Sequence, residues 1–121
     1  MSVALASAWH PRSELPRFQN LRPQLARVYN AIVLAVPPDT DRAIVCALEA
    51  QPLVFVVVTG DWSHGRHAAL QKALETSASH IHYNDFDRLL HWAETRLEEW
   101  RATVAAVEKG DCLIVGRTAQ A

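Results

Sequence analysis

Short apolar runs alternate with longer amphipathic stretches along this chain, and the alternation predicts its fold. Most of the runs are nearly continuous rather than interrupted by polar residues, as expected for strands covered on both faces. Valine dominates the run at 54–58, which favours a strand over a helix. The five predicted strands are Val3–Ala8, Ala31–Val36, Leu53–Val58, the weaker run Ser79–Tyr83, and Leu113–Val115.

Helices are predicted between these runs, where apolar residues recur three and four positions apart. The first covers 13–29, and Pro23 inside it predicts a kink or a division into two pieces. Asp39 or Thr40 is placed to cap a second helix, which Pro52 stops. Each of these helices links two of the predicted strands.

Two further helical stretches are predicted in the second half of the chain. Ser63 can cap a helix that continues through 66–76. After Asp87 a long apolar pattern runs to Gly110, and the capping-box form of Thr95–Glu98 predicts a break near its start. The expected buried stripe of the 66–76 helix is Ala69, Leu70, Ala73 and Leu74.

Strands that alternate with helices of about a dozen residues are typical of right-handed βαβ units. The expected fold class is therefore α/β, a Rossmann-like three-layer sandwich with a mostly parallel sheet of about five strands. A chain of 121 residues fits one core, so residues 1–121 are expected to form a single domain. In such sheets ligands bind beyond the carboxyl ends of the strands, which makes the polar residues after each strand the candidates for function.

Charge and cysteine content narrow the possible partners. The formal net charge is −1, a field too weak to recruit nucleic acid or anionic lipid, so neither is an expected partner. Cys46 and Cys112 lie in apolar periodic segments without Cys-x-x-Cys spacing, which predicts reduced core residues. The first apolar run stops at His10-Pro11, and no run approaches the ~20 residues of a membrane span. The expected compartment is the cytoplasm.

Acidic residues gather after the predicted strands. Aspartates follow three of the five strands and arginines accompany three, a combination that suits a phosphorylated ligand bridged by a divalent metal. Aspartates also cap helices and form turns in any α/β protein, so both interpretations stay open. The sharpest feature is Asp85-Phe86-Asp87, whose two carboxylates can reach one hard cation. Alternatively, Asp87 caps a helix that begins at Arg88.

Histidines offer a weaker metal hypothesis. His80 and His82 would share one face of a strand, so a transition-metal site with Asp85 is conceivable. Ordinary hydrogen bonding to neighbours is the competing interpretation. His64 and His67, three positions apart, can likewise be a metal pair or a solvated helix start.

The tryptophans divide into two pairs. Trp92 and Trp100 lie on a helical apolar stripe and are predicted to be core residues. Trp9 and Trp62 come just after strands, where they could stack on a base or line an interface. The chain contains no nucleophile elbow, Walker loop or Gly-x-Gly-x-x-Gly sequence, which excludes a glycine-cradled phosphate site.

The order of these pieces resembles the nucleotide-binding half of A-type-fold glycosyltransferases, especially the large inverting family (family 2) that uses nucleoside-diphosphate sugars. The most family-like stretch is His80–Leu90, with an Asp-x-Asp after a strand and an aliphatic-rich helix directly behind it. The resemblance covers roughly residues 1–118. The segments that carry it are Val3–His10, Ala31–Asp41, Val54–Asp61, the helix Gly65–Leu74 and His80–Leu90.

By that resemblance, Asp87 would ligate a magnesium or manganese ion, and Asp85 would contact the ribose or the metal. The ion would offset the charge that develops on a departing nucleoside diphosphate. Arg66 would point toward the diphosphate, and the remaining residues would lie near the base and ribose. The implied nucleotide-binding residues are Trp9, His10, Asp39, Asp41, Asp61, Arg66 and Asp85.

Enzymes of this family also have a further half that binds the acceptor and supplies the catalytic base, whereas this chain ends at Ala121. The resemblance therefore implies a truncated domain that binds a nucleoside-diphosphate sugar and is incomplete as a catalyst. One alternative is a non-catalytic α/β domain that self-associates as a homodimer or binds a partner, with a sheet edge or the Trp9 and Trp62 surface covered. Another is a small metal-dependent hydrolase that uses Asp85 and Asp87.

Overall fold

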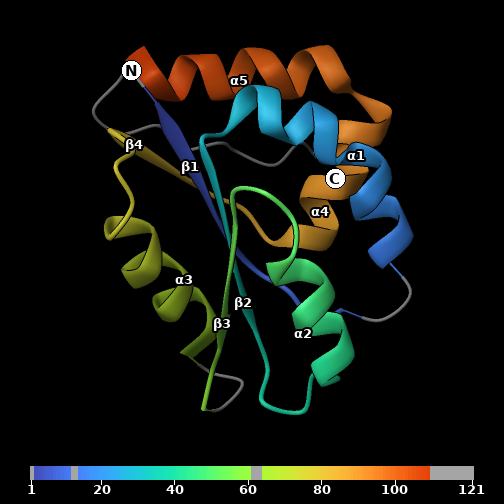
Figure 1. The fold of residues 1–121 in the computed structure, drawn as a ribbon. Helices are drawn as coiled ribbons and strands as arrows, with labels where there is room; N and C mark the ends of the chain where they lie inside the picture. The colour runs from blue at the N-terminus through green and yellow to red at the C-terminus, as the bar shows by residue number, and fades with distance from the viewer. Residues whose placement is uncertain (1, 12–13, 61–63, 110–121) are drawn as a thin grey trace, which may run out of the picture.

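Four parallel strands form one sheet in the order β3-β2-β1-β4 (Figure 1). The structure, a computed structural model, describes residues 2–11, 14–60 and 64–109. The chain steps outward from β1 to β3 and then crosses to the other side of β1 to add β4. The strands are β1 (Val3–Ala8), β2 (Ala31–Val36), β3 (Val54–Val58) and β4 (His80–Tyr83).

Helices cover both faces of this sheet, as predicted for a Rossmann-like α/β layout. The helix α3 (Gly65–Leu74) lies alone on one face of the described sheet (Figure 1). The other face is covered by α1 (Leu15–Val28), α2 (Arg42–Glu49), α4 (Phe86–Thr95) and α5 (Leu97–Lys109). The described residues contain four strands rather than the expected five, and the fifth predicted strand, at 113–115, lies outside them.

The two faces are packed with side chains of different size. On the face covered by four helices, large side chains such as Phe18, Phe86 and Trp100 form the main core. On the other face, small residues dominate, and the alanines Ala69 and Ala73 of α3 rest on the sheet. Small residues let the helix approach closely, so this layer is thin.

The predicted stripe of α3 is half wrong. Ala69 and Ala73 are buried, but Leu70 and Leu74 are 38% and 70% exposed. The helix turns its alanine pair to the sheet, and the leucines one position later lie about 100° around the helix axis. Within the described ranges no second helix covers this face, so there is no neighbouring helix against which the two leucines could pack.

Helix boundaries test the local predictions. The predicted break near Thr95 is confirmed, since α4 ends at Thr95 and α5 begins at Leu97. The first helix is one piece with Pro23 inside it, because Pro23 is exposed and water can solvate the carbonyl group that loses its amide partner. The predicted cap at Ser63 lies outside the described residues.

Two predictions around α2 are wrong. The cap is Asp41, whose side chain accepts a hydrogen bond from the Ala43 amide at 2.9 Å, rather than Asp39 or Thr40. Thr40 instead closes the preceding turn. Cys46 is an exposed free thiol, not a core residue, because this eight-residue helix turns only a narrow side to the core. Cys112 lies outside the described residues.

Candidate functional site

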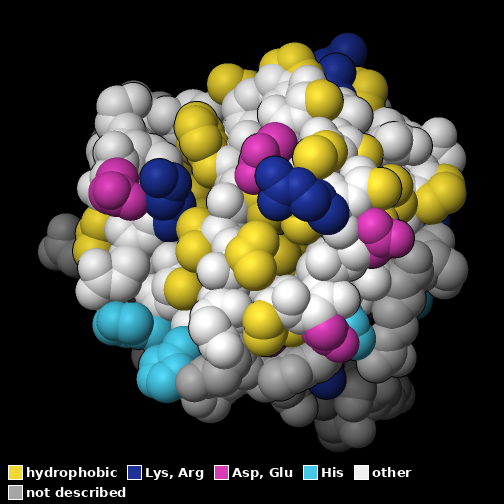
Figure 2. Space-filling model, turned by 60° about the horizontal axis from the view of Figure 1, so that its bottom comes forward, with side chains coloured by type: hydrophobic (Ala, Val, Ile, Leu, Met, Phe, Trp, Pro, Cys, Tyr) yellow, Lys and Arg dark blue, Asp and Glu magenta, His cyan; other side chains and the backbone are white. Residues whose placement is uncertain are grey.

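The carboxyl ends of the strands meet at one end of the molecule, where the sheet order reverses between β1 and β4. Figure 2 brings this end forward and shows hydrophobic side chains between charged ones. A hollow of about 180 Å³ lies here, at the ends of β1, β2 and β3. Its lining residues are Ala8, Trp9, His10, Ala35, Val36, Pro37, Thr59 and Gly65.

Trp9 is fixed at the wall of this hollow by aromatic packing. Its backbone amide donates to the Ala35 carbonyl at 2.9 Å, which extends the pairing of β1 with β2. The indole is 5% exposed, and its ring centroid lies 4.6 Å from that of Phe86 and 6.2 Å from that of Phe18. The indole therefore packs on other rings of the core and also lines the hollow.

The indole N–H of Trp9 is a hydrogen-bond donor without an acceptor among the described residues. Nε1 is buried and has no hydrogen-bond partner among the described residues. A buried donor without an acceptor costs about 1–3 kcal/mol, so a ligand atom that accepts from it recovers this free energy. Trp9 thus lines the hollow and carries a buried indole donor that is unpaired within the described part of the chain.

A second cluster joins the end of β4 to the start of α3. The Asp85 carboxylate accepts from the Tyr83 hydroxyl at 2.8 Å and lies 3.4 Å from the Arg66 guanidinium. Burial and the hydrogen bond to Asp85 raise the pKa of Tyr83. Asp85 occupies the cap position of α4 but makes no capping bond, so its carboxylate is free to face α3. The geometry brings a carboxylate and a cation from separate elements to one place.

Asp87 is not part of this cluster. It lies in the exposed first turn of α4, where its Oδ1 accepts from the Arg88 amide at 2.8 Å. Within the described ranges, no three acidic, histidine or cysteine side chains come together as a metal site. A divalent ion held by one or two carboxylates and phosphate oxygens fits Asp85 only if the ion displaces Arg66.

The other acidic candidates are spread along the same end of the sheet. Asp39 is exposed in the turn after β2, and Asp41 is engaged as the cap of α2. Asp61 and Trp62 lie outside the described residues. The structure therefore brings Trp9 and His10 to the hollow and Asp85 to Arg66, but it gives Asp39 and Asp41 no shared contact with either group.

The predicted histidine and aspartate metal site is wrong. His82 points into the main core, where its Nδ1 lies 2.8 Å from the Tyr29 hydroxyl. Asp85 lies toward the opposite face, beside Arg66 of α3. Burial lowers the pKa of His82 to about 4, which keeps the ring neutral. The competing interpretation, ordinary hydrogen bonding, is correct for this residue.

The structure also shows where Trp92, Trp100 and His67 lie. Trp100 is fully buried, and Trp92 packs against the core while its indole donates to Glu99 at 3.1 Å. His67 lies 3.4 Å from Gln71 one turn along α3. Tyr83 was missed as a site residue, although its two-residue spacing from Asp85 in an extended segment places both on one face.

Comparison with protein-family models, curated proteins and solved structures found no significant match to this chain. Across the part of the chain that the structure describes, no helix is both long and apolar enough to cross a membrane.

Proposed function

We propose that this domain is glycosyltransferase-like and binds a nucleoside diphosphate, or a sugar carried on one, at the carboxyl end of its sheet. The observation that carries the proposal is the hollow beside Trp9, a residue whose buried indole nitrogen has no hydrogen-bond partner in the described ranges. Ligands of open α/β sheets occupy this position beyond the carboxyl ends of the strands.

The hollow and the Arg66 cluster suit different parts of such a ligand. About 180 Å³ accommodates only part of a nucleotide, so the base or ribose enters beside Trp9 and His10. Gly65 lines the same hollow and directly precedes Arg66 at the start of α3. A diphosphate leaving the hollow along α3 therefore meets a guanidinium that is 71% exposed and suited to phosphate oxygens.

A magnesium or manganese ion is part of the proposal. Asp85 would hold it, and Asp87 would join as a second ligand by giving up its contact with the Arg88 amide. Such ions are commonly held by one or two carboxylates and by substrate phosphates. The Arg66 contact with Asp85 is long and exposed, so exchanging it for the ion costs little. Release from Asp85 frees Arg66 for the diphosphate. The proposal is for binding rather than transfer, since the sequence resemblance implies an incomplete catalyst.

Thermal unfolding with uridine or guanosine diphosphate and manganese tests the proposal. Binding to the folded state raises the melting temperature, and Asp87→Ala abolishes the rise. Glu49→Ala is the matched control, since Glu49 is an exposed carboxylate at the far end of α2 and leaves the rise unchanged. If neither nucleotide shifts the melting temperature at millimolar concentration with manganese present, the proposal is wrong.

A further inference from the structure

The edge strand β3 is as apolar as an internal strand. Its sequence, Val54–Val58, contains no charge, proline or glycine, the features that usually protect a sheet edge from pairing. Among the described residues no strand lies beyond it. Phe55 is 44% exposed and Val58 is 52% exposed, on opposite faces of the strand. The β3 edge therefore lacks the usual protection against pairing with another strand, and it exposes an apolar side chain on each face of the sheet.

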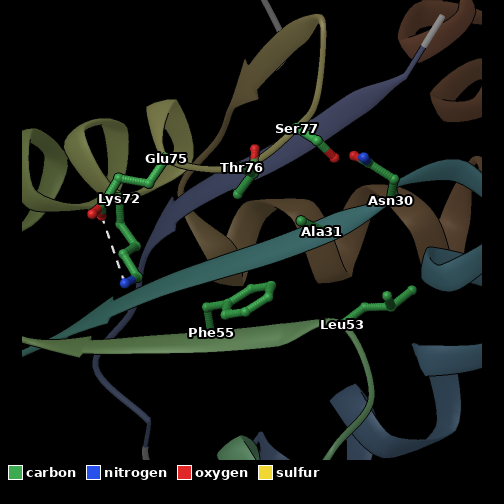
Figure 3. A pocket seen from close by; sticks show the side chains of 8 residues that line it. All are labelled: Asn30, Ala31, Leu53, Phe55, Lys72, Glu75, Thr76 and Ser77. Atoms are coloured by element: carbon green, nitrogen blue, oxygen red, sulfur yellow. Dashed lines mark ion pairs between the residues drawn. The ribbon is translucent and has the colours of Figure 1, made fainter.

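A hollow of about 220 Å³ lies beside the first half of this strand. Figure 3 shows the Phe55 ring standing on β3 beneath it, with Leu53 at its end and the ion pair of Lys72 with Glu75 at its rim. The apolar side chains lie on the floor of the hollow, whereas the charges of α3 lie away from the strand edge. A chain added at β3 would meet apolar groups first.

The hydrogen bonds of β3 show which of its residues face outward. The Leu53 carbonyl accepts from the Ile32 amide, and the Thr59 amide donates to the Val36 carbonyl. The backbone groups of the odd-numbered residues therefore bond to β2. Backbone groups alternate in direction along a strand. The amides and carbonyls of Val54, Val56 and Val58 therefore point away from the sheet. Val54 already has a long contact, 3.4 Å, from its amide to the Gln51 carbonyl, which leaves Val56 and Val58 as the main outward donors.

We propose that two copies of this chain pair antiparallel through β3, about a two-fold axis at Val56. In this register Val56 pairs with itself, and Val58 pairs with Val54 of the second copy. Each outward-facing residue thus meets an outward-facing residue of the second copy, the self-complementarity that a two-fold interface requires. The result is one continuous sheet that contains the four strands of each copy.

The same register covers both exposed side chains of the strand. Phe55 lies opposite Val57 of the second copy in a non-hydrogen-bonded pair, where side chains are closest. On the other face, Val58 lies opposite Val54 of the second copy. A net charge of only −1 gives two copies little mutual repulsion. A second copy therefore fits the edge in hydrogen bonding, side-chain contact and charge.

Sedimentation velocity of the full chain over a concentration series tests this pairing. A reductant must be present, because the exposed thiol of Cys46 could otherwise link copies covalently. The wild-type chain sediments as a dimer in the high micromolar range. Val58→Lys places a charge at the paired edge and weakens dimerisation by about tenfold or more. Circular dichroism confirms that this variant folds, as its half-exposed position allows.

Leu74→Lys is the matched control, since Leu74 is more exposed than Val58 but lies on α3, away from the β3 edge. This variant stays dimeric. Hydrogen exchange gives a second readout, because the Val56 and Val58 amides are protected in the dimer and exchange freely in Val58→Lys. A wild-type chain that is monomeric throughout the series overturns the proposal. So does a dimer that survives Val58→Lys or is lost in Leu74→Lys.

Discussion

The Tyr29 hydroxyl lies 2.8 Å from Nδ1 of His82, inside the main core. Trp100 donates its indole N–H to the same hydroxyl at 3.1 Å. Because the indole can only donate, we assign the hydroxyl proton of Tyr29 to the His82 nitrogen, which accepts it in the neutral ring. These three residues link the end of α1 to β4 and α5 through groups that are buried together.

This network makes the protein sensitive to acid. The pKa of His82 is about 4 in the folded state because burial disfavours the charged ring, against 6.5 for an unhindered histidine. Above pH 6.5 both states are neutral at this site and stability is complete. Below that, the unfolded chain binds the proton more readily, so the free energy of unfolding falls until pH 4, by about 3 kcal/mol from this group. Urea unfolding across this range measures the loss.

The variant His82→Asn separates this effect from general acid sensitivity. It removes the titrating ring, so stability at neutral pH is lower but its decline between pH 6.5 and 4 is shallower. His67→Asn is the control, because His67 is exposed on α3 and the slope should keep its wild-type value. An unchanged slope in His82→Asn would contradict the assignment.

The strands could be predicted because their apolar runs are continuous and are separated by helical spacing. The pattern could not predict which side of a helix faces the sheet when the helix has two adjacent apolar pairs and only one of them can be buried. In α3, Leu70 and Leu74 are more hydrophobic than Ala69 and Ala73, but the alanines are the buried pair. The choice depends on how many helices share that face, a property of the whole fold.

The candidate site could be predicted only in part. The rule that ligands bind beyond the carboxyl ends of strands drew attention to Trp9, which lines the hollow, and to Asp85, which lies beside Arg66. The ion pair of Asp85 with Arg66 joins residues 19 positions apart, and no local pattern encodes it. The spacing of His80 and His82 suggested a metal site. Which face of β4 turns to the core depends instead on Tyr29 and Trp100, residues far away in the sequence.

Pro23 offers a test of local strain in α1. It lies in the helix interior, where a proline removes one backbone hydrogen bond and crowds the preceding turn. Pro23→Ala should raise the free energy of unfolding by about 1–3 kcal/mol, reduced somewhat by the greater freedom of the unfolded chain. Pro16→Ala is the control, because Pro16 lies in the first turn, where a proline is tolerated. Equal gains from both variants in urea unfolding would contradict this account.

Arg66 should matter to binding far more than to folding. Its contact with Asp85 is 3.4 Å long and its side chain is 71% exposed, so Arg66→Gln should cost about 0.5 kcal/mol or less in stability. If Arg66 meets the diphosphate, the same variant weakens nucleoside-diphosphate binding in calorimetry by about tenfold. Arg96→Gln is a close control, with 70% exposure and a 3.5 Å contact to Glu99. A variant of Arg66 that binds as well as the control would remove this residue from the site.

Trp9→Phe tests the buried indole donor directly. The substitution keeps an aromatic ring against Phe18 and Phe86 but removes Nε1, which has no hydrogen-bond partner among the described residues. Loss of packing and relief of the unpaired donor oppose each other, so the melting temperature of the unliganded protein should change little. Nucleoside-diphosphate binding should weaken about fivefold, the worth of one ordinary hydrogen bond. If binding is unchanged while Arg66→Gln weakens it, the ligand lies on α3 and does not enter the hollow.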